Sequence, residues 1–136
     1  MTNRRSFLGA GLAGLAASWL RPRPAAGAPV ARQVAQRDMP AVNLDGWQVT
    51  MTEVSYGPGE RSNRHRHPGF VCGYVLEGQY EFGVDGQPAT VLSAGQPFFE
   101  SPGDVHAVSG NASKTAPARI LAMVFTPKGQ PVTIPG

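Results

Sequence analysis

Residues 59–78 read GERSNRHRHPGFVCGYVLEG and hold two of the three histidines of this 136-residue chain. His65 and His67 are separated by one residue, so on an extended strand both imidazoles point to the same face, with Cβ atoms about 7 Å apart. That separation suits two ligands of a single metal ion. The segment therefore predicts a strand that presents a metal-binding face.

The third histidine, His106, lies in the second half of the chain. A β-barrel can bring it opposite the pair, which would place three neutral imidazoles on one side of an ion and leave positions open for water or substrate. An H-x-H pair by itself is a weak signal. Surface histidines on an edge strand are the alternative interpretation of the pair alone.

From Trp47 onward the chain consists of short β-type segments separated by Gly, Pro or Asp-Gly, without helical periodicity. The 17 Gly and 13 Pro residues argue against a helical bundle. Asp85-Gly86 indicates a tight hairpin, because both positions favour positive φ. These features predict an all-β domain with antiparallel strands closed into a jelly roll or small barrel. The expected strands are Gln48–Tyr56, Arg61–His67, Val71–Leu76, Gln79–Val84, Ala89–Leu92, Pro97–Glu100, His106–Ser109 and Arg119–Phe125, with Val132–Ile134 as a further candidate.

Two motifs that contain the histidines resemble the paired motifs of the cupin superfamily. The resemblance covers about residues 47–132, and the two motifs occur in the family's order and separation. It implies a small single-domain cupin with a jelly-roll or double-stranded β-helix barrel. The matching positions are Gly59, His65, His67 and Gly78 in the first motif, and Gly95, Ser101-Pro102-Gly103, His106 and Asn111 in the second.

The chain departs from the family pattern at three places. Val71 and Cys72 stand where the first motif has its metal-binding glutamate, Ser101 replaces a proline, and Asn111 lies one residue late. Two ligand sets are therefore possible. Either the site is a three-histidine one, as in cupin dioxygenases that cleave diketones or oxidise thiols, or a carboxylate elsewhere completes it. Glu100, on the strand that leads to His106, is the best candidate.

Glu100 and Cys72 each have a second interpretation. The Glu100 carboxylate could instead accept backbone N–H groups of the following turn. Cys72 is expected to be a small core side chain rather than a thiolate ligand or nucleophile. Strand alternation places Cys72 on one face with Phe70 and Val71 on the other. If Val71 stands at the position of the family's glutamate, the resemblance implies that Val71 faces the metal cavity and Cys72 does not.

The N-terminal segment, residues 1–27, resembles a twin-arginine export signal. Arg4-Arg5 precedes an apolar stretch, Phe7–Leu20, that is too short to span roughly 30 Å of hydrocarbon comfortably. We expect cleavage after Gly27 and a periplasmic location, with an uncleaved anchor as the alternative. Residues 28–46 are expected to be a linker or N-terminal arm, and residues 47–136 the cupin domain.

The formal net charge of +3 comes from the export segment. Four of the 12 Lys and Arg residues and none of the nine acids lie in the first 27 residues, so the mature chain carries 8 − 9 = −1. This balance removes the electrostatic reason to expect a nucleic-acid partner.

The sequence therefore predicts an exported small cupin that binds a divalent transition metal, namely Fe, Mn, Zn or Ni, through His65, His67 and His106, with Glu100 as the candidate fourth ligand. An oxygenase that acts on a small chelating substrate is the first functional hypothesis. A non-catalytic binding or sensor module is the second, and a structural cupin with relict histidines is the third. A homodimer is expected by analogy with the family.

Overall fold

The computed structural model describes residues 31–136, and residues 32–136 form one compact unit. The predicted export signal and its cleavage site after Gly27 lie outside the described residues. Residues 32–46 contain no strand or helix, and the first strand begins at Trp47. No helix in the described part of the chain is long and apolar enough to cross a membrane.

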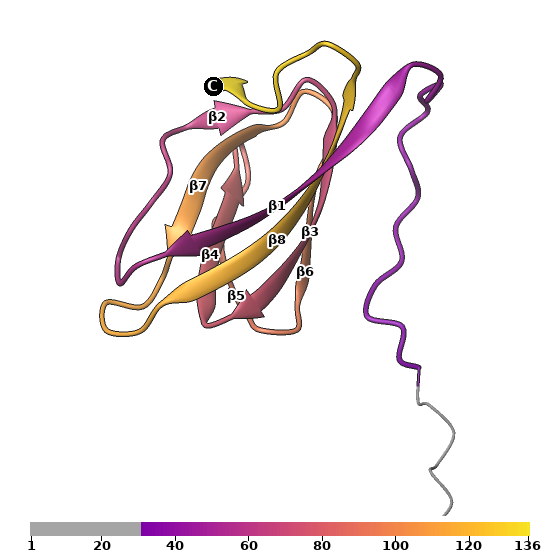
Figure 1. Cartoon of the computed structure of the whole chain (residues 1–136). Helices are drawn as coiled ribbons and strands as arrows, with labels where there is room; N and C mark the ends of the chain where they lie inside the picture. The colour runs from indigo at the N-terminus through magenta and orange to yellow at the C-terminus, as the bar shows by residue number, and fades with distance from the viewer. Residues whose placement is uncertain (1–30) are drawn as a thin grey trace, which may run out of the picture. The chain divides into compact units, whose positions relative to one another are not determined.

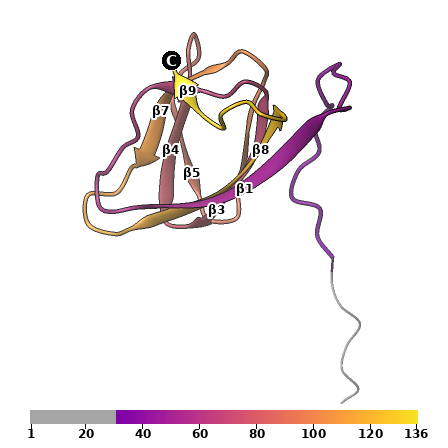
Figure 2. The same ribbon diagram turned by 45° about the horizontal axis from the view of Figure 1, so that its top comes forward.

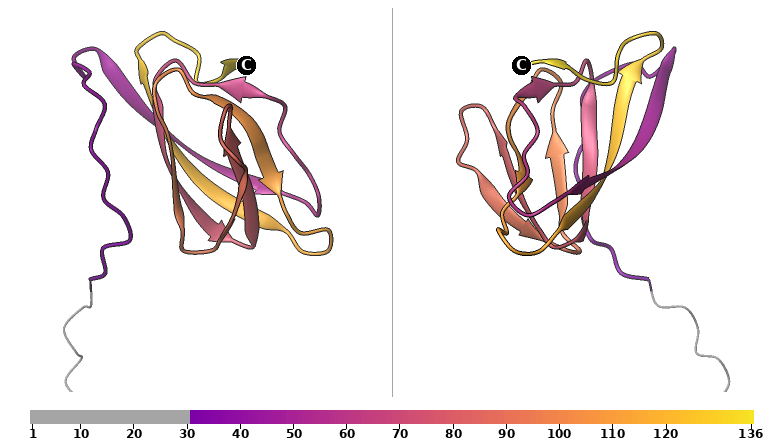
Figure 3. Two further views of the ribbon diagram at one scale, coloured as in Figure 1. Left: turned by 180° about the vertical axis from the view of Figure 1, so that it is seen from behind. Right: turned by 60° about the vertical axis from the view of Figure 1, so that its left-hand side comes forward.

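Within residues 31–136, nine antiparallel strands form two sheets that lie face to face (Figures 1 and 3). The four-stranded sheet has the order β1-β8-β3-β6, and the five-stranded sheet has the order β5-β4-β7-β2-β9. This arrangement confirms the predicted all-β jelly roll. The strands are β1 (Trp47–Tyr56), β2 (His65–Arg66), β3 (Phe70–Glu77), β4 (Gln79–Val84), β5 (Thr90–Ser93), β6 (Pro97–Glu100), β7 (Val105–Asn111), β8 (Ala118–Pro127) and β9 (Ile134–Pro135).

The strand predictions hold best where turn signals are strong. β4 and β6 have the predicted bounds. Asp85-Gly86 lies in the turn after β4 with Gly86 at a φ of 77°, but Asp85 does not have the expected positive φ, and the innermost β4–β5 pair is Phe82–Thr90, so the hairpin is wider than predicted. The predicted strand Arg61–His67 is wrong in length, because only His65–Arg66 joins a ladder. Pro68 has no N–H to donate and so ends the pairing on one side. On the other side, Arg61 forms only an isolated bridge with Gly110. Near the C-terminus, β9 pairs with β2 (Figure 2).

The core lies between the two sheets and is built from alternate residues of the strands. Val71 and Val75 of β3 point inward and are almost fully buried, as the period of two requires. Gly73 lies between them, and a Cβ there would stand 1.9 Å from the Phe98 ring. Phe98 therefore packs directly on the β3 backbone. The buried core cluster comprises Tyr56, Val71, Val75, Tyr80, Phe98, Ile120 and Val124.

The outer face of the four-stranded sheet is also rich in apolar side chains. Cys72 lies on this face and is partly exposed, so its predicted core position is wrong. It borders a groove of about 240 Å³ between residues 35–40 and strands β3 and β6. Arg37 closes this groove by donating to Ser101 Oγ at 3.0 Å and lying over the Phe99 ring. Tyr74, Phe99 and Phe125 are only partly buried.

Candidate metal centre

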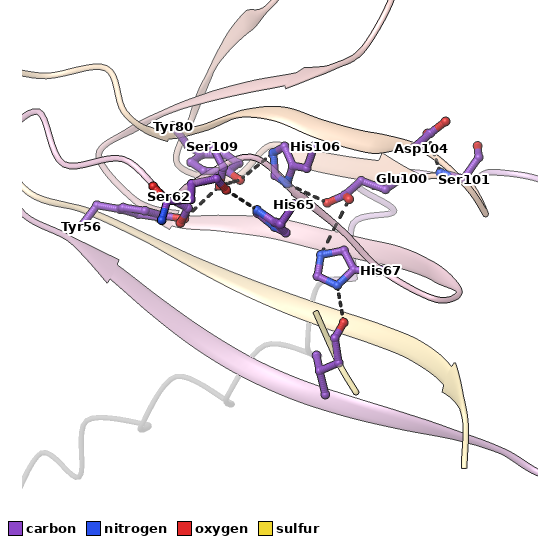
Figure 4. Close-up of polar contacts among 12 residues, drawn as sticks. Tyr56, Ser62, His65, His67, Tyr80, Glu100, Ser101, Asp104, His106 and Ser109 are labelled. Carbon is purple, nitrogen blue, oxygen red and sulfur yellow. Dashed lines mark hydrogen bonds and ion pairs between the residues drawn. The ribbon is translucent and has the colours of Figure 1, made fainter. Parts of the chain in front are cut away.

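The three histidines come together at one end of the interior. His65 on β2 is the direct cross-strand partner of His106 on β7. His67 lies one residue beyond β2, and its ring centroid is 5.1 Å from that of His65. One ring nitrogen from each of the three lies within 4.8 Å of the others (Figure 4). This confirms the predicted gathering of His65, His67 and His106, in a geometry that could hold one metal ion.

Two of the imidazoles are oriented by backbone carbonyls. His65 Nδ1 lies 2.7 Å from the Asn63 carbonyl oxygen, and His67 Nδ1 lies 2.6 Å from that of Val132. In a neutral imidazole whose Nδ1–H donates to a carbonyl, the Nε2 lone pair is free for a metal. Desolvation lowers the pKa of His65, an effect that the Asn63 carbonyl partly offsets and the neighbouring imidazoles reinforce. His65 is therefore held in the neutral form that ligation needs.

Glu100 lies among the imidazoles and is buried, with an exposed fraction of 4%. Its Oε1 is 3.1 Å from His106 Nδ1, and its Oε2 is 3.8 Å from His67 Nε2. Oε2 is buried without a hydrogen-bond partner among the described residues. A buried carboxylate oxygen without a partner is costly unless a cation faces it. The residues present therefore fit a divalent metal at this position.

The alternative role for Glu100, as an acceptor for the following turn, is filled by another residue. The turn runs from Ser101 to Asp104, and Gly103 has a φ of 87° that suits a type II turn after Pro102. The Ser101 backbone N–H donates to Asp104 Oδ2 at 2.7 Å, and the Asp104 N–H donates to the Ser101 carbonyl at 3.1 Å. Asp104 stabilises the turn, which leaves the Glu100 carboxylate free to face the histidines.

The position of Glu100 relative to Val71 explains how the chain could function without the motif glutamate. Val71 is buried and borders the interior cavity, as strand alternation predicts. On the neighbouring strand β6, its direct antiparallel partner is Glu100. Side chains of such a pair share one face of the sheet, with Cβ atoms about 5 Å apart. The carboxylate is thus present on the same face of the sheet, one strand away from the family's position.

The cavity beside the histidines has a volume of about 380 Å³. Val54 of β1 and Ile120 and Val124 of β8 form an apolar wall on the four-stranded sheet. The five-stranded sheet contributes hydroxyl groups from Tyr80 of β4 and Ser109 of β7, and the Tyr80 hydroxyl lies 3.3 Å from His106 Nε2. The arrangement can hold a small molecule against an ion bound by the histidines.

Sequence reasoning missed the hydroxyl group beside the histidines. No role in the site was assigned to Tyr80, Tyr56, Ser62 or Ser109 from the sequence. Strand alternation on Gln79–Val84 could have placed Tyr80 inward. Nothing local indicates that its hydroxyl meets Ser109, since the two residues lie on different strands, β4 and β7.

The comparisons agree with this fold. The sequence profile of the cupin domain matches residues 52–124, which is more than half of the chain, so the chain belongs to the cupin family. No curated protein matches it in sequence.

Solved structures similar to this chain share its double-stranded β-helix. An uncharacterized conserved protein from Klebsiella pneumoniae is 23% identical with a TM-score of 0.51, over 60% of this chain and 69% of that one. The DMSP lyase DddQ from Ruegeria pomeroyi is 22% identical with a TM-score of 0.54, over 64% of this chain and 42% of its own. An oxalate oxidase in complex with glycolate is 22% identical with a TM-score of 0.54, over 77% of this chain and 65% of that one. At these identities the likeness establishes the fold alone.

Proposed function

We propose that this protein is an exported cupin that binds one divalent transition metal through His65, His67, His106 and Glu100. The observation that carries the proposal is the buried Glu100 Oε2, which has no hydrogen-bond partner in the described part of the chain and lies 3.8 Å from His67 Nε2. Imidazole and carboxylate ligands together suit Fe, Mn, Zn or Ni. Four protein ligands leave coordination positions that a small chelating molecule can occupy.

The proposed activity is oxidation of a small chelating substrate by an oxygenase mechanism. A redox-active metal such as Fe(II), when bound, would supply a template and an electron path for substrate and dioxygen. The protein's own residues orient the imidazoles through the Asn63 and Val132 carbonyls and line one side of the cavity with an apolar wall. Oxidation and lyase activities both occur among the proteins with this fold, as the oxalate oxidase and the DMSP lyase illustrate.

A non-catalytic binding or sensor module is the second candidate. Among the described residues that border the cavity, Glu100 is the single carboxylate, and the metal would occupy it. No other carboxylate there could act as a general base, which favours binding without turnover. Oxygen uptake by the Fe(II)-loaded protein with diketones, phenolics and thiols distinguishes the candidates. Uptake that His106→Ala abolishes supports the oxygenase, whereas no uptake with any of these compounds supports the binding module.

Moving the carboxylate between paired strands tests the proposed ligand set. Glu100→Val should weaken Co²⁺ binding by at least about tenfold, because losing even a residue that only supports a ligand typically costs 10- to 100-fold in affinity. Because Val71 and Glu100 are direct partners, the double variant Val71→Glu/Glu100→Val should recover most of the affinity. Glu53→Val, which removes an exposed carboxylate on β1, serves as the matched control. Unchanged affinity in Glu100→Val would exclude Glu100 as a ligand.

Export by the twin-arginine route to the periplasm is part of the proposal. The support is the Arg4-Arg5 pair ahead of the apolar stretch Phe7–Leu20. This route carries folded proteins, so the protein could acquire its metal before export. Arg4→Lys/Arg5→Lys should retain the protein in the cytoplasm, and fractionation of cells that express both forms would show whether it does.

We also propose a homodimer, formed through the outer face of the four-stranded sheet. Val49 and Met51 on its edge strand β1 are 51% and 62% exposed. They continue the apolar outer face of Met123 and Phe125, their register partners on β8. An edge strand with an exposed apolar face is a common site for pairing with another chain. Sedimentation of the wild type and of Met51→Lys should give a dimer and a monomer, respectively.

A further inference from the structure

We infer that the cavity selects a ligand with one monoanionic chelating head and a neutral, mainly apolar body that ends in a hydrogen-bonding group. This inference rests on the proposed metal site and adds the class of molecule that the site would accept. Three features of the cavity carry it. They are an uncharged cluster of hydroxyl groups, the balance of charge around the histidines, and an apolar wall.

The hydroxyl cluster consists of Ser62, Tyr56, Ser109 and Tyr80 and reaches His106. Its consecutive oxygens are separated by 2.9, 2.9 and 2.8 Å, and the Tyr80 oxygen is 3.3 Å from His106 Nε2 (Figure 4). Tyr56, Tyr80 and Ser109 are buried, whereas Ser62 is exposed. All four residues border the cavity. The cluster therefore forms a continuous polar strip from the exposed Ser62 to the metal centre.

This strip is electrically neutral. It is built only from the hydroxyl groups of serine and tyrosine side chains, which carry no charge at neutral pH. A hydroxyl group can donate one hydrogen bond and accept others, so Tyr56 and Ser109, with two partners each, retain capacity for one more. A neutral hydroxyl, carbonyl or amide of a ligand can use this capacity. A charged group of a ligand at this place would lose its hydration and meet only neutral partners. Burying an unpaired charge is costly, so such a group is disfavoured.

The charge around the proposed metal also limits the ligand. A divalent ion and the Glu100 carboxylate together carry one net positive charge. No Lys or Arg is present among the described residues that border the cavity. A monoanionic chelator brings the buried centre to neutrality, whereas a dianion leaves a net negative charge without a cationic partner. The cavity therefore favours monoanionic heads over dicarboxylates.

The remaining surface suits an apolar body. Val54, Ile120 and Val124 face the cavity from the four-stranded sheet, and Phe98 faces it from β6 of the same sheet. The volume of about 380 Å³ lies near the lower end of the ~300–1,000 Å³ range of small-molecule cavities. A single aromatic ring or a short branched chain between the chelating head and the polar end would be in contact with this wall.

Titration calorimetry on the full-length protein loaded with Co²⁺ tests the inference with three probes. Benzohydroxamate has a monoanionic chelating head on an apolar ring, 4-hydroxybenzohydroxamate adds a neutral polar end, and oxalate is a dianion. We expect benzohydroxamate to bind at least about tenfold more tightly than oxalate. The 4-hydroxyl group should add a further fivefold to tenfold, the effect of about one net hydrogen bond.

Two variants assign the extra affinity to the hydroxyl cluster. Tyr56→Phe and Ser62→Ala should each reduce the preference for the 4-hydroxyl group and leave benzohydroxamate affinity within about twofold. Ser62 is exposed, so its variant should fold even if Tyr56→Phe does not. Tyr74→Phe, on β3 and outside the cavity lining, is the matched control and should retain the preference.

The outcomes distinguish a failure of the proposed metal site from a failure of the proposed ligand class. Protein that takes up no Co²⁺ overturns the proposed function and this inference with it. Protein that takes up Co²⁺ but binds oxalate as tightly as benzohydroxamate overturns the inference alone. A 4-hydroxyl preference that is absent, or that survives in both Tyr56→Phe and Ser62→Ala, also overturns it.

Discussion

Asn111 and Glu100 are both buried polar side chains, each at the centre of a polar cluster. The two clusters differ in whether the protein itself supplies every hydrogen-bond partner. Asn111 is fully buried, and its amide group donates to the carbonyls of Gly57 and Ala116 at 3.0 and 2.7 Å. Its Oδ1 accepts from the Ser113 N–H at 2.9 Å. Glu100 is buried almost as deeply, yet its Oε2 has no partner within the described chain. The protein completes the first cluster from its own atoms and leaves the second incomplete.

This difference assigns the two clusters to different tasks. A polar side chain with all of its hydrogen bonds made inside the protein supports the fold, here by joining the end of β1 to the segment after β7. A buried carboxylate with an unpaired oxygen lowers stability until a cation binds. The Asn111 cluster is therefore structural, and the Glu100 cluster is suited to a ligand. The following predictions test that contrast, from the largest expected effect to the smallest.

Asn111→Ala should lower the free energy of unfolding of the metal-free protein by about 3 kcal/mol, because it leaves several backbone groups without partners. Urea denaturation in the presence of EDTA measures this change. Asn43→Ala, which removes an exposed asparagine side chain, should cost less than about 1 kcal/mol. Equal losses in the two variants would contradict a structural role for the Asn111 cluster.

Zn²⁺ at about 100 times its dissociation constant should raise the free energy of unfolding by about 2.7 kcal/mol, since the metal binds the folded state preferentially. Thermal melting with Zn²⁺ and then with excess EDTA follows the gain and its reversal. His106→Ala should not respond to Zn²⁺. A melting temperature that Zn²⁺ leaves unchanged in the wild type would argue against the metal site.

Glu100→Val should stabilise the metal-free protein by about 1–2 kcal/mol, because it replaces a buried, incompletely paired carboxylate with an apolar side chain. The sign is opposite to that expected for Asn111→Ala. The same urea titration in EDTA measures both variants. A clear loss of stability in Glu100→Val would mean that the carboxylate is already satisfied without metal.

Acid should weaken the metal-free fold slightly through the histidine cluster. The pKa of His65 is lowered in the folded state, chiefly by desolvation, from its ordinary value of about 6.5. The unfolded chain then binds more protons below pH 6.5, so stability falls as pH decreases from 6.5 toward the lower folded-state pKa. His65→Gln should flatten this part of the stability profile. Asn111 does not titrate, so Asn111→Ala should keep the wild-type slope.

Much of the fold could be predicted because strand signals are local. Alternation with a period of two placed Val71 on the cavity side and Cys72 on the other, and both placements are confirmed. The same alternation could not show that the outer face is only partly covered, so the burial predicted for Cys72 was wrong. The length of β2 was also wrong, because it depends on which neighbours pair with it.

The sequence by itself determined the β-rich architecture and the types of metal-binding side chain available, since turn residues, alternation and the H-x-H spacing act over a few residues. Only the tertiary structure decided which carboxylate meets the histidines and which hydroxyl groups join them. Those contacts depend on the register of β3 against β6 and of β4 against β7. Register is fixed by how whole strands bury their apolar faces together, and a shift of one residue would turn Glu100 away from the site.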